Sequence, residues 1–368
     1  MAVVVTTVAS PPSGATTLYV DKWGGGEYRT IGEALDAAES GDEILVAPGF
    51  YWLSEALEFG QRVLTLRSIL GPDHTTIGGP EGDHCILVEG PDPVNGTSRI
   101  EGFTIRDAQA LYGAGIRCDD CALDIVDCSF EDCIAFAGDH HWSDGKGGGL
   151  FSRRSTVSVT DCAFVGNVAL SRGGGIYSEE SYLTVSGCRF ENNSEFLYGT
   201  GCEGVAVATT GYSVSISDCE FIGNQGQDGA AVRGWGFVEM QNCTVAHNST
   251  DEDGSALNIG IGIIERCVVA FTEPGRGVAC DQRTTFTKCV VFGNAAGDSL
   301  CSNYSDNLFV EPLMCDSEVG DLGLCADSPC LPEGNAWGVL VGANGQVCGP
   351  CDTATEPRSW TSIKAMFR

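Results

Sequence analysis

The side chains best suited to chemistry concentrate in two short segments, residues 136–146 and 194–200. Candidate proton donors, bases and cations in and between them are His140, Asp144, Lys146, Arg172 and Glu195, and candidate ligand-binding residues in and just beyond them are Trp142, Phe196, Tyr198 and Asp228. Carboxylates beside a His or a Lys could act as general acid and base, and aromatic rings could stack on a ligand. The simpler interpretation is that these are solvated loop residues whose rings pack on the flank of the protein.

A cysteine repeat indicates how these segments are positioned. Its members are Cys128, Cys162, Cys188, Cys219, Cys243, Cys267 and Cys289, which lie 34, 26, 31, 24, 24 and 22 residues apart. A Phe or Val stands two residues after each Cys, and an Asn usually stands five residues after it. Apolar and polar residues alternate between these anchors, which is typical of β-strands. Strands that recur once in about 24 residues predict a solenoid of stacked coils.

Stacking would place Cys on Cys, Phe on Phe and Asn on Asn at the strand spacing of about 4.8 Å. We expect each Asn to occupy a turn, because Asn tolerates a left-handed backbone and can bond to the Asn of the next coil. We expect the Cys column to be unpaired and buried rather than disulfide-bonded or metal-binding, since neighbours on parallel strands bridge poorly. The two lengthened intervals follow Cys128 and Cys188, so segments 136–146 and 194–200 should leave the solenoid along one edge.

Residues 18–51 read LYVDKWGGGEYRTIGEALDAAESGDEILVAPGFY, which indicates a strand, a short helix near Thr30 to Ala38, a turn and a second strand. This segment closely resembles the entry into the pectin-lyase-like superfamily of right-handed β-helices, in which the helix caps the apolar end of the stack. Residues 64–79 and 100–106 also resemble the first coils of uncharacterised secreted bacterial members and of polymorphic outer-membrane passenger domains. The resemblance implies an all-β, single-stranded right-handed parallel β-helix over residues 18–310, with a short amino-terminal capping helix.

The resemblance does not supply an active site. Pectic hydrolases of the superfamily carry Asn-Thr-Asp, Asp-Asp and Gly-His-Gly on successive coils, and Asp119-Asp120 is similar only to the second of these. The esterase signature Gly-x-x-Asp-Phe-Ile-Phe-Gly is missing, as is a lyase pattern of basic residues beside a calcium site. No catalytic residue is carried over, because one scaffold hosts many chemistries.

The chain is expected to continue with a Cys-rich closing segment, residues 311–351, similar to those of secreted bacterial β-helices. Its cysteines are Cys315, Cys325, Cys330, Cys348 and Cys351. We expect them to form disulfides whose pairing the sequence leaves open; the alternative is a zinc site of Cys325, Cys330, Cys348 and Cys351, of which only the last two have the tight spacing. Residues 1–17 form an amino-terminal extension and residues 352–368 a tail, whose end could be an amphipathic sorting or anchoring helix.

The net charge of the chain disfavours several classes of binding partner. The 368 residues include 50 Asp plus Glu, 20 Lys plus Arg and 19 Cys, with a formal charge of −30. This charge disfavours nucleic acid and anionic membranes, and the sequence shows no basic patch. It also disfavours polyuronates unless calcium bridges them, and the acidic run at residues 251–253 lacks the spacing of a calcium loop. We expect no other cofactor, and no membrane span because no 18-residue apolar run occurs.

Together these features favour a secreted bacterial protein, extracellular or at the cell surface, with a non-enzymatic binding or structural role toward a glycan or surface protein. The alternative is a polysaccharide lyase or glycosidase acting in a cleft between the 136–146 and 194–200 loops. A third hypothesis is self-assembly, in which residues 3–8 pair with a strand edge of a neighbouring chain. The apolar start lacks the basic region of a signal peptide, and we expect any export signal to have been removed.

Overall fold

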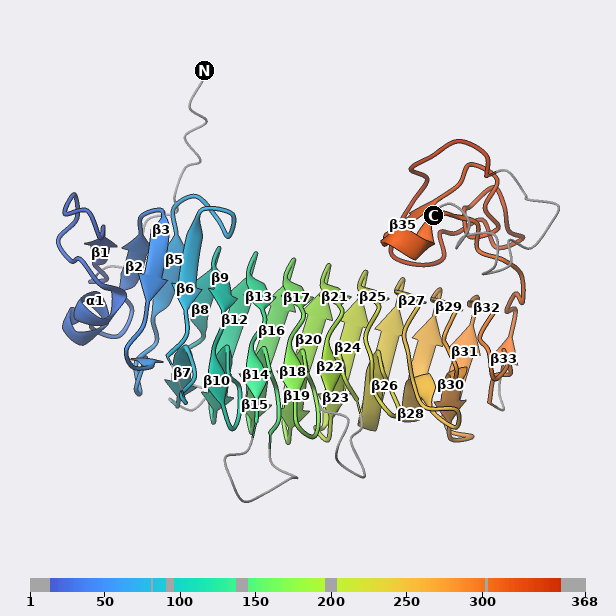
Figure 1. Ribbon diagram of the computed structural model, residues 1–368, viewed down its shortest axis with the longest axis horizontal. Helices are drawn as coiled ribbons and strands as arrows, with labels where there is room; N and C mark the ends of the chain where they lie inside the picture. Colours follow the sequence, from blue (N-terminus) through green and yellow to red (C-terminus); the bar gives the residue numbers. More distant parts are fainter. Residues whose placement is uncertain are drawn as a thin grey trace, which may run out of the picture.

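The computed structural model describes residues 14–80, 82–90, 96–136, 145–195, 204–301 and 304–351. Its strands stack into one elongated solenoid, with helix α1 (Ile31–Ala37) at one end and the Cys-rich segment folded against the flank near the other end (Figure 1). Strand pairs within the described solenoid are parallel. The predicted all-β right-handed β-helix with an amino-terminal helix is confirmed. Residues 3–8 and the tail from 352 onward lie outside the described residues.

Each complete coil contributes up to four strand segments. The first and second segments form the large sheet, which consists of β1 (Thr17–Val20), β2 (Glu43–Val46), β4 (Leu57–Glu58), β5 (Thr65–Ser68), β7 (Ile86–Glu89), β8 (Ser98–Glu101), β11 (Ile116–Asp119), β12 (Ala122–Val126), β15 (Leu150–Arg153), β16 (Thr156–Thr160), β19 (Ile176–Glu179), β20 (Tyr182–Ser186), β23 (Val207–Thr209), β24 (Ser213–Ser217), β26 (Val232–Gln241), β28 (Ser255–Glu265), β30 (Arg276–Cys280), β31 (Thr284–Thr287) and β33 (Tyr304–Ser305). The first segments, such as β11, β15 and β19, are called the first wing below.

The third segments form the second sheet, which consists of β3 (Gly49–Trp52), β6 (Thr75–Gly78), β9 (Thr104–Arg106), β13 (Ser129–Glu131), β17 (Ala163–Val165), β21 (Arg189–Glu191), β25 (Glu220–Ile222), β27 (Thr244–Ala246), β29 (Val268–Ala270) and β32 (Val290–Phe292). The short fourth segments are β10 (Gln109–Ala110), β14 (Ile134–Ala135), β18 (Val168–Ala169) and β22 (Ser194–Glu195). The four segments enclose a core that runs the length of the solenoid.

Left-handed residues make the corners between segments. In one coil, Asp120, Asp127 and Asp132 have φ angles of 55°, 50° and 52°. The expectation that the column Asn itself occupies the turn was wrong, because the left-handed residue is the one before it: Asn192, with φ 53°, precedes Asn193. The turn is therefore complete before the column Asn, whose side chain faces the interior and is fully buried.

Interior columns hold the coils in register. The Phe column consists of Phe130, Phe164, Phe190 and Phe221, whose ring centroids lie 4.6, 4.9 and 4.8 Å apart. In the Asn column, Asn193 Nδ2 donates to the Phe164 carbonyl at 2.9 Å and to Asn224 Oδ1 at 2.9 Å. These distances match the strand spacing, and the bonds satisfy amides that have no access to water.

The seven cysteines of the repeat are buried and unpaired, as predicted. A further buried thiol, Cys133, stands where later coils have Asn, and burial raises its pKa to about 12. A thiol that stays protonated is a poor nucleophile, so Cys133 packs as a small apolar group.

Helix α1 closes the amino-terminal end of the core, near the predicted 30–38 range. Thr30 is its N-cap and accepts a hydrogen bond from the Glu33 amide at 3.2 Å, while Glu33 accepts from the Thr30 amide at 3.2 Å. This reciprocal capping box satisfies two amides that would otherwise lack partners. Ile31 and Leu35 are buried on its inner face, which shields the first coil from water.

The Cys-rich segment folds into a small lobe around β34 (Met314–Asp316), the 3-10 turn η2 (Ser317–Val319) and β35 (Asp321–Leu324), with β34 and β35 antiparallel. Disulfides join Cys315 to Cys348 and Cys325 to Cys351. The expectation for Cys330 was wrong: it is unpaired and buried, and burial raises its pKa to about 12. It packs in an apolar cluster between lobe and solenoid, so the zinc set that included it does not assemble.

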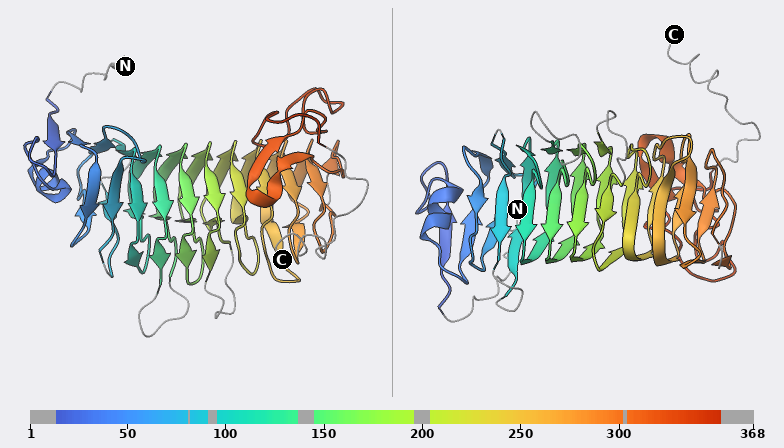
Figure 2. Two further views of the ribbon diagram at one scale, coloured as in Figure 1. Left: turned by 45° about the horizontal axis from the view of Figure 1, so that its top comes forward. Right: turned by 90° about the horizontal axis from the view of Figure 1, so that it is seen from below.

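The lobe lies across the outer face of the second sheet (Figure 2). Arg189 donates to the Gly320 carbonyl at 3.3 Å, the Ala343 amide donates to Thr244 Oγ1 at 3.0 Å, and the His247 ring lies 2.9 Å from Ser317 Oγ. Two further disulfides, which the sequence did not predict, join Cys118 to Cys121 and Cys280 to Cys301. Among the described residues no helix has the length and apolar character needed to span a membrane.

Candidate binding face

The outward side chains of the first wing form a continuous row across five coils. The strand register aligns Arg117 with Phe151, Phe151 with Tyr177, Tyr177 with Ala208, and Ala208 with Arg233. With its surroundings this row makes what we call the cationic face, which consists of Tyr112, Arg117, Asp119, Lys146, Phe151, Arg153, Arg172, Tyr177, Glu179, Ala208, Asp228, Arg233 and Trp235. Adjacent strands are about 4.8 Å apart, so neighbouring members can contact one extended ligand.

Aromatic rings form the floor of the cationic face. Phe151 lies between Tyr112 and Tyr177, with ring centroids 5.2 and 5.9 Å away. Phe151 and Tyr177 point away from the core yet are only 2% and 1% exposed. Lys146 contributes to this cover, because its Nζ lies 5.0 Å from the centroid of the Tyr177 ring. The floor is therefore a packed support for the cations above it.

Trp235 is the aromatic ring of the face that is most open to solvent, at 38% exposure. The guanidinium carbons of Arg172 and Arg233 lie 4.8 and 4.7 Å from its ring centroid. Arg233 is also held by Asp228 Oδ2 at 3.1 Å. Cation–π contacts thus hold two guanidinium groups against one indole.

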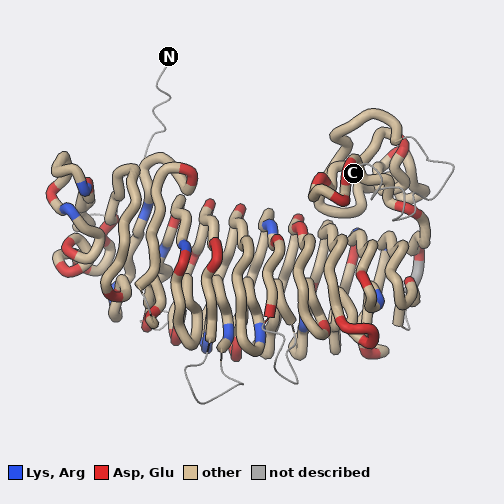
Figure 3. The backbone as a smooth tube through the Cα atoms, in the orientation of Figure 1, with Lys and Arg blue, Asp and Glu red and all other residues tan. Residues whose placement is uncertain are grey.

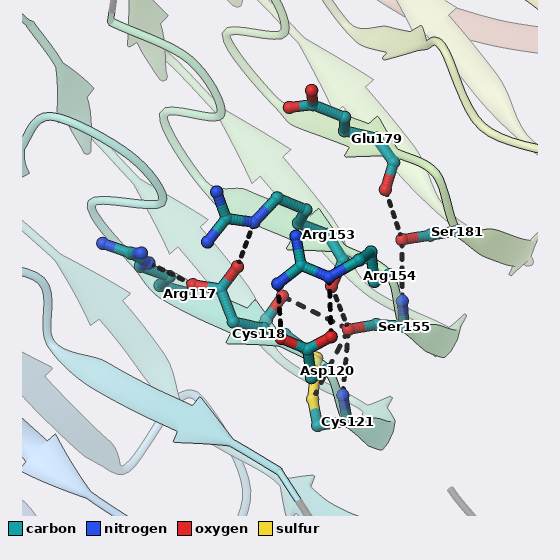
Figure 4. Close-up of polar contacts among 10 residues, drawn as sticks. Arg117, Cys118, Asp120, Cys121, Arg153, Arg154, Ser155, Glu179 and Ser181 are labelled. Atoms are coloured by element: carbon teal, nitrogen blue, oxygen red, sulfur yellow. Dashed lines mark hydrogen bonds and ion pairs between the residues drawn. A yellow bond between two sulfur atoms is a disulfide. The ribbon is translucent and has the colours of Figure 1, made fainter. Parts of the chain in front are cut away.

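Asp119 organises the other end of the face. Its carboxylate is 5% exposed and lies 2.6 Å from Nε of Arg117 and 2.8 Å from Nε of Arg153, two side chains that Figure 4 labels. The adjacent Asp120 forms a separate, exposed pair with Arg154, with 2.7 Å between Arg154 Nε and Asp120 Oδ1. The Cys118–Cys121 disulfide closes the corner that separates these two carboxylates from β12.

The local charge differs from that of the whole chain. The cationic face has five cations, Arg117, Lys146, Arg153, Arg172 and Arg233, and three carboxylates, Asp119, Glu179 and Asp228. The full sequence has 20 cations and 50 carboxylates. Figure 3 shows several Lys and Arg positions along the lower edge of the solenoid, interspersed with Asp and Glu positions. On this face the five cations outnumber the three carboxylates, so the local balance of charge is opposite in sign to the net charge of the protein.

The structure places some of the residues singled out from sequence on this face. Lys146 and Arg172 are neighbours, because isolated bridges pair Tyr112 with Lys146 and Lys146 with Arg172. His140, Trp142, Asp144, Phe196 and Tyr198 lie outside the described residues, so the cleft between the two loops stays a prediction.

Glu195 is buried in the solenoid, and Asp228 is partly buried at the edge of the cationic face. Glu195 is 5% exposed and occupies the interior position that Ala169 and Ala135 fill in the two preceding coils. Its Oε1 accepts a hydrogen bond from the Gln227 amide. Asp228 Oδ1 accepts from the Ser255 hydroxyl at 2.7 Å, and its Oδ2 holds Arg233. Asp228 is thus positioned to orient the face, and its role as a ligand contact stays a prediction.

Arg117, Arg153, Arg233, Tyr177 and Trp235 were not recognised from the sequence. A signal was present for most of them, because the first-wing residue after each apolar anchor points outward. The relevant pairs are Ile116-Arg117, Leu150-Phe151, Ile176-Tyr177 and Val232-Arg233. This position, compared from coil to coil, predicts the outward row. The long intervals after Cys128 and Cys188 indicate only the loops.

The fold and the cationic face together define a right-handed parallel β-helix protein with a concentrated site on one outer sheet. The chain belongs to the family described as the right handed beta helix region, which matches residues 92–311 and so more than half of the sequence. No curated protein matches the chain in sequence.

Several solved structures have a similar backbone at low identity. A pectin methylesterase from Aspergillus niger is 16% identical, with 90% of this chain and 98% of that chain covered and a TM-score of 0.41. Geobacillus virus E2 ORF18 is 13% identical, with coverages of 79% and 59% and a TM-score of 0.43. A mannuronic acid specific polysaccharide family 6 lyase from human gut microbiota is 11% identical, with coverages of 79% and 83% and a TM-score of 0.38. The fold assignment rests on the family match and the strand register.

Proposed function

We propose that this protein binds an acidic polysaccharide along the cationic face and acts without chemical conversion of it. The observation that carries the proposal is the gathering of five cations and an exposed indole on adjacent coils of a chain whose formal charge is −30. Such a concentration favours an anionic ligand that extends over several coils.

The repeat geometry suits a polymer. Successive coils present their outward groups at intervals of about 4.8 Å, and this step is comparable to the length of one sugar residue. A uronate chain that runs along the solenoid would therefore meet Arg117 on one coil, Lys146 and Arg153 on the next, Arg172 on the third, and Arg233 two coils further on. Arg binds carboxylate through two parallel hydrogen bonds, which adds orientation to charge attraction.

The net charge does not oppose this ligand at the face itself. The charge of the whole chain led us to expect polyuronates to bind only through calcium. The clustered cations support direct binding instead, because a local potential within about one Debye length, 8 Å at physiological salt, dominates at a binding site. Four disulfides also support an oxidising, extracellular setting, where polysaccharides of this kind occur.

The test is a calorimetric titration with a hexamer of galacturonic acid, using its fully methyl-esterified form as an uncharged counterpart. We expect the acid to bind, the ester to bind at least about tenfold more weakly, and the affinity for the acid to fall as salt rises. The double variant Arg172→Gln/Arg233→Gln should lower the affinity for the acid by about tenfold or more.

Arg106→Gln provides the matched control. Arg106 lies on β9 in the second sheet, away from the cationic face, and its substitution removes a charge of the same type. We expect this variant to bind the acid like the unmodified protein. Equal affinity for acid and ester, or no effect of the double variant, would contradict the proposal.

Catalysis is the second candidate, favoured by one observation. Glu195, within segment 194–200, introduces a carboxylate into an interior position where preceding coils have Ala. A buried carboxyl group near a glycan site could act as a general acid in a glycosidase or a lyase. If so, incubation with polysaccharides should release new reducing ends or unsaturated products, and Glu195→Gln should abolish them without unfolding the protein. A chain that binds the acid hexamer yet leaves every substrate intact is a binding protein only.

A further inference from the structure

A second group of exposed aromatic rings lies at the amino-terminal end of the solenoid, beside the capping helix. Trp23, Phe50 and Trp52 are 81%, 36% and 64% exposed. Trp23 belongs to the loop after β1, and the other two alternate along β3 with the buried Tyr51. Exposed large aromatic rings that gather in one place indicate a binding surface more often than scattered ones do.

Packing holds the Trp52 ring in one orientation. The indole lies directly against Gly78 of the next coil. It leaves no room for a side chain at that position, because a Cβ atom on Gly78 would lie 2.3 Å from indole Cε3. The indole is therefore seated against the second sheet on one side and open to water on the other. The Phe50 ring lies 4.8 Å away at an angle of 55°. Together these rings form a small platform whose open side is already oriented for a ligand.

Lys22 ties the platform to the neighbouring loop. Its Nζ donates a hydrogen bond to the Phe50 carbonyl at 2.7 Å. The same ammonium lies 5.2 Å from the centroid of the Trp23 ring and 5.9 Å from that of Tyr51. Trp23 is thus held near β3 by a cation that bonds to β3 itself, which brings a third ring beside the platform.

A cavity of about 740 Å³ adjoins the platform between α1, β3 and residues 53–58. Lys22, Phe50 and Trp52 line it, so the platform and the cavity are continuous. Ligand sites for small molecules commonly have about 300–1,000 Å³. The space therefore suits a ligand of a few rings. Two of the elements that line it, α1 and β3, lie at the amino-terminal end of the solenoid (Figure 1).

The charges around the cavity select the ligand. Four carboxylates that do not cap the helix, Asp36, Glu55, Glu58 and Asp83, line it, whereas Lys22 and Arg29 are its cations. The excess of carboxylates over cations disfavours a polyanion, and the Lys22 ammonium already occupies the position beside the Trp23 and Tyr51 rings that a ligand cation would take. A fitting ligand is uncharged, with apolar ring faces for the indole and hydroxyl groups that can donate to carboxylates. These properties describe a neutral oligosaccharide of hexose or pentose units.

We propose that Trp52, Phe50 and Trp23 form a second glycan site, specific for neutral oligosaccharides, at the amino-terminal end of the solenoid. Sugar rings stack on Trp52, and their hydroxyls bond to the carboxylates of the cavity. This site is independent of the cationic face, because it uses different residues and the opposite charge. Each site can be present without the other.

The test titrates the full chain with cellohexaose, xylohexaose and mannohexaose, following tryptophan fluorescence and heat. We expect at least one neutral hexasaccharide to bind, and Trp52→Ala to weaken that binding by about tenfold, as is usual for the loss of an aromatic stacking residue. Gly78→Ala is a second variant that keeps every ring but displaces the indole, and it should also weaken binding. Melting curves of both variants verify that the solenoid stays folded.

Trp235→Ala is the matched control, since it removes an indole from the cationic face alone. It should leave neutral binding within about twofold and weaken binding of the galacturonic acid hexamer. The proposal is overturned if none of the three hexasaccharides binds, or if Trp52→Ala and Gly78→Ala bind them unchanged. It is also overturned if these rings instead mediate contact between copies, which light scattering would report as concentration-dependent association that Trp52→Ala removes while sugars have no effect.

Discussion

Inward and outward positions of the same first-wing strands follow different rules. The inward column is Ile116, Leu150, Ile176, Val207 and Val232, all aliphatic and all buried. The outward row on the same strands is Arg117, Phe151, Tyr177, Ala208 and Arg233. An inward side chain must fit the residue about 4.8 Å above and below it, whereas an outward one meets water or a ligand. The repeated interior side chains therefore stabilise the fold, whereas the outward side chains, which differ from coil to coil, are free to form a binding site.

The largest effect should come from a substitution in the interior, after which both the stability of the fold and the affinity for the ligand are measured. Phe190 lies between Phe164 and Phe221 in the Phe column and is fully buried. We expect Phe190→Ala to lower the free energy of unfolding by about 3–5 kcal/mol, through lost burial and the cavity left behind. Urea unfolding at equilibrium measures this change.

Binding should be much less sensitive to the same substitution. Under conditions where Phe190→Ala stays folded, its affinity for the galacturonic acid hexamer should match that of the unmodified protein. Thr184→Ala, an exposed change on β20, is the control and should alter stability by less than about 0.5 kcal/mol. A large loss of affinity in folded Phe190→Ala would show that interior and surface are not separable.

Asp119 provides an intermediate case, because it is part of the outward face yet almost fully buried. Asp119→Ala would leave the Arg117 and Arg153 guanidinium groups without their shared carboxylate. We expect a loss of about 1–3 kcal/mol in unfolding free energy, smaller than that of Phe190→Ala because both Arg side chains reach water. Urea unfolding again gives the value.

The exposed ion pair between Arg154 and Asp120 is the control for the Asp119→Ala experiment. The Arg154–Asp120 pair has side-chain exposures of 45% and 54%, so water screens it. Arg154→Gln should lower the free energy of unfolding much less than Asp119→Ala does. Equal losses of unfolding free energy in Asp119→Ala and Arg154→Gln would show that the burial of Asp119 adds no stability.

The same division explains what the sequence could predict. The parallel β-helix, the unpaired Cys column and the capping helix followed from residues that repeat because stacking constrains them. Arg233 and Trp235 obey no such repeat, so their grouping with Arg172 depends on strand register and side-chain direction. Cys330 was assigned to a disulfide from composition alone, yet its place in the apolar contact between lobe and solenoid leaves it buried and unpaired. Long-range contacts of this kind leave no local pattern.

The outer face of the second sheet offers the smallest test, because the carboxyl-terminal lobe covers the part of it that β25, β27, β29 and β32 form. His247 lies at this contact, stacked 4.9 Å from the Phe271 ring and 2.9 Å from Ser317 Oγ. Burial lowers the pKa of His247 below its ordinary value of 6.5, although the nearby carboxylates of Glu318 and Glu273 oppose that shift. The neutral ring is therefore the form that the docked lobe favours.

Acidification should consequently loosen the lobe. A His whose pKa is lowered by docking contributes its full stabilisation above about pH 6.5, and that contribution is lost as the pH falls toward the lower value in the docked state. We expect exchange of the Ala343 amide, which donates to Thr244 Oγ1, to accelerate by less than about fivefold between pH 7 and 5 after correction for intrinsic exchange. His247→Phe keeps a ring against Phe271 but does not titrate, so its corrected exchange should not change with pH. If acid also accelerates exchange in that variant, another group controls the contact, and this covered face depends on charge in a way that His247 does not explain.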